Sequence, residues 1–210
     1  MKDFFNDGYL VSERFLDKED CYKLFQQMIS DWKSVSDYSY IHEENFRIHS
    51  PMQMNEFIMS IIKKITSQHL DLLKTFFDGE DAWLAELSSI CVFPNAKSQH
   101  IHRDQSNPKG KLLTFFVNIF DICDDCGPLV VAPGYHKNEK EDVDYDDVIK
   151  LSVPSGSYII MNSLLPHAGS ANTTSSNIRP VFYFSIGSLD LKGSTYSISQ
   201  NYWEKIKFEF

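Results

Sequence analysis

The chain has 210 residues, of which 42% are hydrophobic and 14% aromatic, proportions that fit a globular protein and exclude a largely disordered one. The formal net charge of −9 disfavours broad electrostatic binding to nucleic acid or to an anionic membrane surface. The N-terminus lacks the basic start and apolar run of a secretory signal, and no stretch approaches the roughly 18 apolar residues of a membrane helix. We therefore expect a soluble, cytoplasmic protein with no membrane or nucleic-acid partner.

The first third of the chain has the apolar periodicity of helices. Asp17 can cap a helix whose apolar face is formed by Cys21, Leu24, Phe25, Met28 and Trp32. Ser50 and Pro51 predict the start of a second helix, and Gln53 completes a capping box. Its buried stripe comprises Met54, Phe57, Ile58, Ile61, Ile62 and Ile65. His69 continues that stripe and is expected in the core or at its boundary.

From about Trp83 the pattern changes to short strand-like runs separated by turns rich in Pro, Gly and Asn. The predicted strands are 84–93, 100–104, 112–120, 129–132, 148–153, 157–161 and 179–186. This order predicts a mostly β fold with flanking α-helices, in which a double-stranded β-helix (jelly roll) is backed by N-terminal helices. We expect one domain over 1–210, with the helical part over about 1–80 and the jelly roll over about 81–210.

Cys123 and Cys126 have the spacing of a CxxC motif, but no second pair of Cys or His residues follows to complete a zinc site. Without a secretory signal, the four cysteines are expected to be reduced thiols. Both residues are therefore interpreted as part of an acidic turn.

The residues that point to chemistry are His102, Asp104 and His167. His102 and Asp104 are two positions apart on a predicted strand, so their side chains share a face. Two imidazoles and one carboxylate are typical of the metal site of non-haem Fe(II) oxygenases. Arg179 opens a later apolar strand, and a guanidinium buried there requires an anionic partner such as the distal carboxylate of 2-oxoglutarate.

Two alternatives remain open. His100 and His102 also share a face, so a cupin-type metal dioxygenase could use His100, His102 and His167, although the Glu that such a pattern adds is missing from 106–108. In that case His100 binds metal; otherwise it is a candidate for a position beside the metal site or the substrate. Jelly rolls also serve as non-catalytic ligand-binding modules, because fold alone does not decide function.

Four segments resemble the phytanoyl-CoA dioxygenase family of Fe(II)/2-oxoglutarate-dependent oxygenases, over nearly the whole chain. Residues 4–20 resemble its N-terminal stretch, and 99–104 (QHIHRD) resemble its Q-x-x-H-x-D segment. Residues 126–137 are similar to its NGPL…PGSHK signature, and 167–179 to its H-x-G-x-x-N…R segment. The departures are Cys126, where Asn is usual, and Tyr135, where Ser is usual.

The resemblance implies that His102, Asp104 and His167 form the catalytic Fe(II) site. It also implies that Arg179 binds 2-oxoglutarate as cosubstrate together with O2, and that Gln99 lies close to 2-oxoglutarate.

Thr114 and Asn118 alternate on the strand after the metal-binding motif, so both are further candidates for the cosubstrate pocket. The reaction implied by the resemblance is hydroxylation of a C–H bond of a small-molecule substrate, with release of succinate and CO2. Neither the substrate nor the oligomeric state can be predicted.

Overall fold

The computed structural model describes residues 2–34, 46–105, 110–138, 142–188 and 206–209. The helices are α1 (Lys2–Asp7), α2 (Lys18–Ser34), α3 (Glu56–Thr66) and α4 (Leu70–Phe76), with 3-10 turns at Ser67–His69, Tyr135–Lys137 and Tyr145–Asp147. The strands are β1 (Tyr9–Ser12), β2 (Arg47–Pro51), β3 (Ala82–Val92), β4 (Leu112–Asn118), β5 (Leu129–Val131), β6 (Ile149–Leu151), β7 (Tyr158–Asn162), β8 (His167–Gly169), β9 (Arg179–Gly187) and β10 (Lys207–Phe208).

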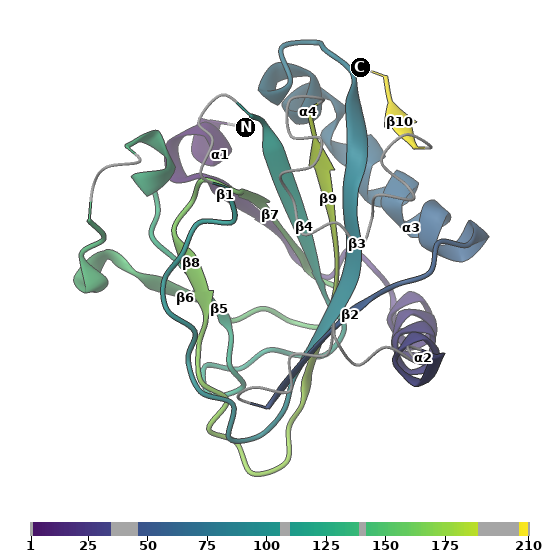
Figure 1. Ribbon diagram of the computed structural model, residues 1–210, viewed down its shortest axis with the longest axis vertical. Helices are drawn as coiled ribbons and strands as arrows, with labels where there is room; N and C mark the ends of the chain where they lie inside the picture. The colour runs from purple at the N-terminus through teal and green to yellow at the C-terminus, as the bar shows by residue number, and fades with distance from the viewer. Residues whose placement is uncertain (1, 35–45, 106–109, 139–141, 189–205, 210) are drawn as a thin grey trace.

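Two antiparallel sheets form the centre of the molecule. The larger has the order β1-β7-β4-β9-β3-β10, with β2 also paired to β3, and the smaller has the order β6-β5-β8. Figure 1 shows the sheets facing each other, with α2, α3 and α4 on the outer side of the larger one. Apolar side chains from both sheets form a cluster between them, including Leu129, Val131, Leu151, Ile159 and Met161. The mostly β architecture with flanking helices confirms the predicted jelly-roll fold.

The two faces of the larger sheet differ in character. Alternation along its strands sends one set of side chains outward, where they pack with the helices and are 2% exposed or less; this set includes Leu87, Leu113, Phe115, Phe184 and Ile186. The opposite set points toward the smaller sheet and includes Glu86, Ser88, Thr114, Tyr183 and Ser185. The hydrophobic core therefore lies mainly under the helices, which leaves the space between the sheets available for polar chemistry.

The helix predicted after Asp17 is confirmed as α2, and the Asp17 side chain accepts a hydrogen bond from the backbone of Asp20. The predicted helix start at Ser50 and Pro51 is wrong, because both residues pair with β3 and end β2. α3 instead begins at Glu56, where the Asn55 side chain caps it. Pairing with a long central strand outweighs the local capping signal. The stretch predicted to be helical thus also contributes β1 and β2 to the larger sheet.

Two further predictions differ from the structure. The strand predicted over 100–104 is reduced to one isolated bridge, at His102. Cys123 and Cys126, expected as reduced thiols, form a disulfide because the turn brings their Cα atoms within 5.2 Å, a separation that suits such a bond. Cys21 and Cys91 are free and buried.

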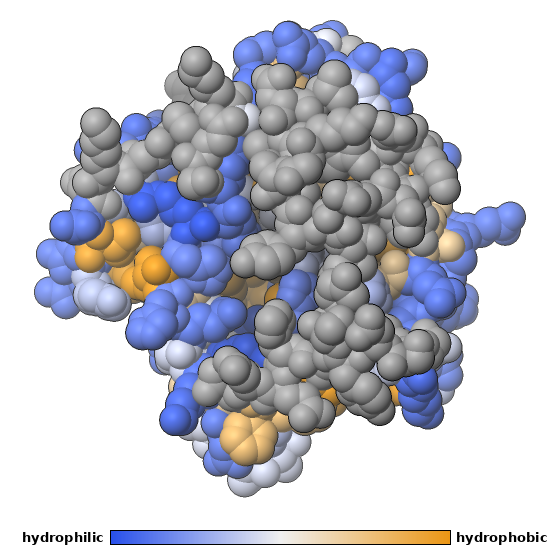
Figure 2. All heavy atoms as spheres, viewed as in Figure 1, coloured by the Kyte–Doolittle hydropathy of each residue, from blue (hydrophilic) through white to orange (hydrophobic). Residues whose placement is uncertain are grey.

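Among the described residues, no helix combines the length and the apolar character needed to cross a bilayer. The described residues on the face seen in Figure 2 are mostly hydrophilic, with small and separate hydrophobic patches.

Candidate active site

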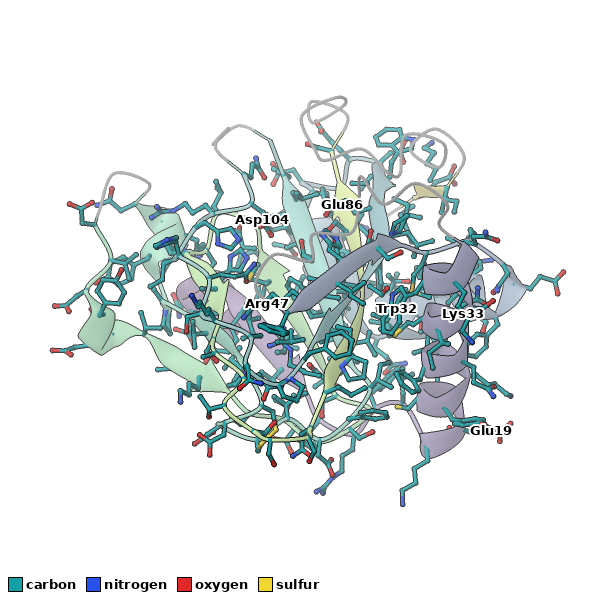
Figure 3. The ribbon with its side chains drawn as sticks, turned by 60° about the horizontal axis from the view of Figure 1, so that its bottom comes forward. Glu19, Trp32, Lys33, Arg47, Glu86 and Asp104 are labelled. Atoms are coloured by element: carbon teal, nitrogen blue, oxygen red, sulfur yellow. A yellow bond between two sulfur atoms is a disulfide. The ribbon has the colours of Figure 1, made fainter. Side chains whose placement is uncertain are left out.

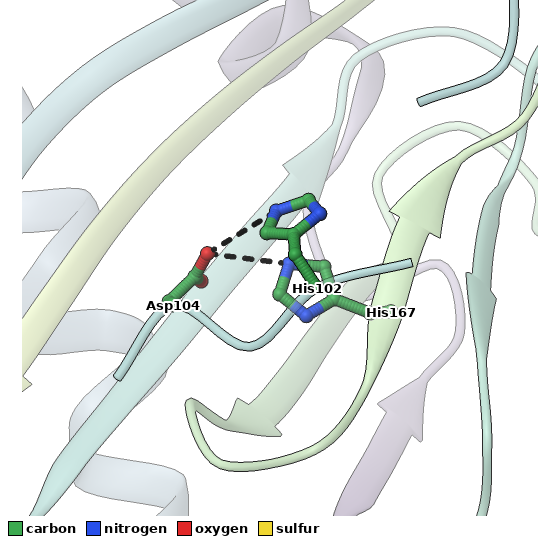
Figure 4. A group of neighbouring side chains, drawn as sticks. All are labelled: His102, Asp104 and His167. Atoms are coloured by element: carbon green, nitrogen blue, oxygen red, sulfur yellow. Dashed lines mark ion pairs between the residues drawn. The ribbon is translucent and has the colours of Figure 1, made fainter. Parts of the chain in front are cut away.

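His102, Asp104 and His167 converge between the two sheets (Figure 4). The Oδ1 atom of Asp104 lies 3.5 Å from Nε2 of His102 and 3.4 Å from Nε2 of His167. One donor atom from each residue lies within 4.8 Å of the other two. Within the described part of the chain, this is the one such group of three or more His, Cys, Asp or Glu residues.

The fold brings these donors together through backbone pairing. His102 and His167 exchange two backbone hydrogen bonds of 2.9 Å, which places the segment before Asp104 against β8. The next residue, Gln105, donates its backbone N–H to the carbonyl of Ser163 and so fixes the far side of Asp104. The position of the carboxylate therefore follows from contacts on both flanks rather than from a regular strand.

Each imidazole has one nitrogen committed to the backbone. Nδ1 of His102 lies 2.9 Å from the carbonyl oxygen of His100, and Nδ1 of His167 lies 2.9 Å from that of Leu165. A carbonyl only accepts, so both Nδ1 atoms carry the proton and donate it. Both Nε2 atoms therefore face Asp104: each donates to the carboxylate when its imidazole is protonated, and offers its lone pair to a metal ion when the imidazole is neutral, as metal-binding histidines do.

The charges of the group favour an ionised carboxylate. Burial alone would raise the pKa of Asp104, but His167 and hydrogen bonds from both imidazoles lower it below the ordinary value. The hydrogen bond to Asp104 in turn raises the pKa of His102. The side chains of His102 and Asp104 are 42% and 34% exposed, against 6% for His167, so the group is reachable from solvent on one side.

The donor set fits a divalent transition metal. Nitrogen and oxygen ligands held about 2.1 Å from one ion lie roughly 3 Å apart, close to the separations seen around Asp104. Two imidazoles and a carboxylate on one side of an ion leave its other positions free, which is the arrangement of non-haem Fe(II) sites. The site is therefore preformed for a single ion.

His100 does not join this group. Its backbone carbonyl, rather than its exposed imidazole, contacts His102. The geometry therefore favours the set that contains Asp104 over the cupin-type set of His100, His102 and His167.

Arg179 opens β9 on the inner face and is 7% exposed. It donates a hydrogen bond from Nη1 to the carbonyl of Gly127, whose φ of 76° favours glycine. Its Nε has no partner among the described atoms, and no described carboxylate forms an ion pair with it. Burial, together with the nearby charge of Arg47, lowers the pKa of Arg179 to about 10. A buried guanidinium without a carboxylate partner is costly, so Arg179 is suited to bind an anionic ligand.

Arg47 was missed by the sequence analysis. It lies on β2 in the same row as Arg179, with Val92 between them, and is 8% exposed. It donates hydrogen bonds to the backbone carbonyls of Lys97, Gly169 and Ser170. Because the stretch from Ser50 was interpreted as a helix start, no sequence signal placed Arg47 on an inward-facing strand.

The other predicted pocket residues are Gln99, Thr114 and Asn118, and the first two are hydrogen-bonded to neighbouring protein groups. Gln99 is exposed, and its Oε1 accepts a hydrogen bond of 2.8 Å from the backbone of Gly169. The hydroxyl of Thr114 is hydrogen-bonded to those of Ser163 and Ser185. Asn118 is 5% exposed, and its Nδ2 has no partner within the described atoms. The structure therefore brings Thr114 and Asn118 to the inner face, while Gln99 braces β8 from the edge.

Glu86 is a further inward-facing acid that the sequence analysis missed. Its side chain accepts a hydrogen bond of 2.8 Å from Oγ of Ser185. Burial, with a smaller contribution from the Asp104 carboxylate, raises the pKa of Glu86 from 4.5 to about 7. The charged form of Glu86 is thus costly in the folded protein.

Glu86→Gln is expected to stabilise the metal-free protein at alkaline pH. Since the pKa of Glu86 rises from 4.5 to about 7 on folding, its ionisation removes stability as pH rises across that window. The neighbouring groups are Asp104, Tyr183 and Ser185, none of them a cation. Denaturant unfolding should show equal stability at about pH 4.5, and a variant more stable by about 1–3 kcal/mol at about pH 8. A wild type at least as stable as Glu86→Gln at about pH 8 would contradict the burial of the Glu86 carboxyl group.

Comparison with known proteins gives consistent matches. The sequence model described as phytanoyl-CoA dioxygenase (PhyH) matches residues 4–181. The dioxygenase aneA of Aspergillus aculeatus (strain ATCC 16872 / CBS 172.66 / WB 5094) is 27% identical over an alignment of 115 residues, and the match covers 48% of this chain. That match spans only 39% of the length of aneA.

Two solved structures share the fold. The epimerase SnoN, crystallised with Fe3+, alpha ketoglutarate and nogalamycin RO, has a TM-score of 0.65 and 13% identity, covering 88% of this chain and 80% of SnoN. The non-heme alpha ketoglutarate dependent carbocyclase SnoK from nogalamycin biosynthesis has a TM-score of 0.67 and 14% identity, covering 89% of this chain and 82% of SnoK. With the family match extending over most of the sequence, the chain belongs to the phytanoyl-CoA dioxygenase family.

Proposed function

We propose that this protein is an Fe(II)- and 2-oxoglutarate-dependent dioxygenase that hydroxylates a C–H bond of a small-molecule substrate and releases succinate and CO2. The observation that carries the proposal is the convergence of two Nε2 atoms on one carboxylate oxygen, at 3.4 and 3.5 Å. Two structural neighbours support the same assignment, SnoN in complex with Fe3+ and alpha ketoglutarate and SnoK described as non-heme and alpha ketoglutarate dependent.

Each residue has a defined part in this proposal. His102, Asp104 and His167 hold Fe(II), with both imidazoles oriented by the backbone carbonyls that accept from Nδ1. Bound Fe(II) supplies the oxidising chemistry by which O2 and 2-oxoglutarate are consumed and a C–H bond is attacked. Arg179 provides the planar donor fork that the distal carboxylate of 2-oxoglutarate requires.

Polar side chains of the inner sheet face define the rest of the pocket. Asn118 has an unused amide N–H2 group near the row of Arg179, and it can donate to the cosubstrate. Thr114 holds Ser163 and Ser185 in place and so positions the wall beside Asp104. Gln99 supports β8, the strand that carries His167.

Succinate formation tests the proposal. Wild-type protein supplied with Fe(II), 2-oxoglutarate and O2 should form succinate and CO2 in equal amounts, even without its substrate. Loss of one imidazole ligand in His102→Ala should lower the rate by about 100-fold or more, since an iron ligand is removed. Quantifying succinate by mass spectrometry gives the rate for each variant.

His100→Ala is the matched control, because the His100 imidazole lies outside the metal group. It should retain succinate formation within a few-fold. Loss of turnover in His100→Ala with retention in Asp104→Ala would instead support the cupin-type set. Equal turnover in wild type and His102→Ala would contradict any assignment to this site. Product analysis once a substrate is known would separate hydroxylation from ring closure and epimerisation, the reactions of the two structural neighbours.

A further inference from the structure

A β-bulge turns Glu86 into the space between the sheets. On β3, Leu84 lies opposite Ile186 and packs outward in the core under the helices. Strict alternation would send Glu86 to that same apolar face. The register shifts between Leu84 and Glu86, however, so that Glu86 lies opposite Ser185 and shares its inward direction. Bulges commonly redirect a side chain beside an active site, and here the redirected side chain is a carboxyl group.

Glu86 is the acidic end of a row of hydroxyl groups. The row runs from Ser163 through Thr114 and Ser185, at 3.2 and 3.0 Å, and ends with a hydrogen bond to Oε2 of Glu86. Among the described residues, the hydrogen bond from Ser185 to Oε2 is the one that Glu86 accepts, so its Oε1 has no partner there. Figure 3 shows that Arg47, Glu86 and Asp104 lie in the central part of the molecule, whereas Glu19 and Lys33 belong to α2 at its outside.

The surroundings of Glu86 are accessible and partly apolar. Phe116 and Ile90 lie on the same inner face and are partly exposed, although both belong to central strands. The outward neighbours Phe115 and Phe184 on these strands are 0% exposed. Solvent therefore reaches the inner face through the space between the sheets, and the same space gives access to the Glu86 carboxyl group.

No described cation balances Glu86. The charged group that acts on it is the Asp104 carboxylate, which repels it, and no described Lys, Arg or His forms an ion pair with it. Arg179 lies six positions from Ser185 on β9, about 20 Å along the strand. In the proposed function, the charges of Fe(II), Asp104, the 2-oxoglutarate dianion and Arg179 sum to zero, and Arg47 lies in the row of Arg179, at the far end of the sheet from Glu86, with its guanidinium bonded to backbone carbonyls. Glu86 is then a carboxylate without a described cationic partner at its own end of the inner face, and a half-buried charge of this kind favours a ligand cation.

We infer that Glu86 is the anchor for a protonated amine, and that the substrate carries a basic nitrogen next to an apolar or aromatic group. The ammonium group would donate to the unpaired oxygen of Glu86, while the apolar part extends toward Phe116, one row further along the inner face. This substrate class rests on the proposed function, because it places the substrate beside the metal donors. The ammonium site itself can be measured without turnover.

Paired probes of equal size test the inference. Protein loaded with Mn(II) and 2-oxoglutarate is titrated calorimetrically with benzylamine and, separately, with benzyl alcohol, at about pH 8, where an alkylammonium stays protonated. Wild type should bind the amine about tenfold or more tightly than the alcohol, since one charge-assisted hydrogen bond separates them. Glu86→Gln, which keeps the shape of the side chain, should bring the ratio close to one. The affinity for 2-oxoglutarate should remain within about twofold.

Glu80→Gln is the matched control, because Glu80 is exposed in the turn that precedes β3. It should keep the wild-type preference for benzylamine. An undiminished preference in Glu86→Gln would overturn the inference, since the amine would then be ligating the metal or binding elsewhere. No preference in wild type, or no binding of either probe, would also overturn it. A preference that depends on Glu86 in protein that binds neither Mn(II) nor 2-oxoglutarate would uphold the ammonium site and refute the proposed function.

Discussion

Asp104→Ala is expected to lower the affinity for Fe(II) by about 100-fold or more and to abolish 2-oxoglutarate consumption. Asp104 supplies the one carboxylate toward which both Nε2 atoms point, so its loss leaves two neutral imidazoles for a divalent ion. The thermal unfolding temperature gives a readout that is independent of turnover. An excess of Fe(II) at about 100 times its Kd should stabilise wild type by about 2.7 kcal/mol and leave Asp104→Ala almost unchanged.

Asp146→Ala is a suitable control for this substitution. Asp146 is an exposed residue of the 3-10 turn Tyr145–Asp147, outside the metal group. This variant should bind Fe(II) and respond to it as wild type does. Metal-induced stabilisation of equal size in Asp104→Ala would show that Fe(II) binds elsewhere.

Arg179→Met is expected to weaken 2-oxoglutarate binding by about 100-fold or more while changing Fe(II) affinity only a few-fold. A bidentate pair with a carboxylate contributes about 3 kcal/mol, which corresponds to this factor. Stability should change by less than about 1 kcal/mol, because the lost hydrogen bond to Gly127 is offset by the removal of a buried charge without a carboxylate partner. Calorimetric titration of 2-oxoglutarate and denaturant unfolding measure the two effects separately.

The exposed Arg14 provides a control, since Arg14→Met should leave both quantities unchanged. A large loss of stability in Arg179→Met, with 2-oxoglutarate affinity retained, would identify Arg179 as a structural brace of the Gly127 turn. It would also remove the main reason to place the cosubstrate at this end of the sheet.

The convergence of His102, Asp104 and His167 could be predicted from the sequence because metal chemistry constrains residue types. The pattern consists of an HxD motif, a later His and an Arg at the start of an apolar strand. It indicates metal and cosubstrate binding even where the local secondary structure is predicted wrongly. His102 illustrates this: it lies in a single bridge rather than in the expected strand, yet the same backbone pairing brings it to His167. The overall fold was likewise predictable from the change of hydrophobic period near Trp83.

The polar inner face could not be predicted, because it depends on sheet register. Glu86 faces inward only because of the bulge after Leu84, and nothing in the local sequence marks that shift. Arg47 was missed for a related reason: Ser50 and Pro51 have the local features of a helix start, while β3 recruits them into β2. The Cys123–Cys126 disulfide depends on turn geometry, which spacing alone does not determine.

Anaerobic titration of the metal-free protein with Fe(II) in the presence of 2-oxoglutarate measures most directly whether His102, Asp104 and His167 form one metal centre. The geometry predicts a single ion per chain, with binding lost when all three residues are replaced by alanine. Undetectable binding by wild type, or one bound ion per chain in the triple variant, would contradict it.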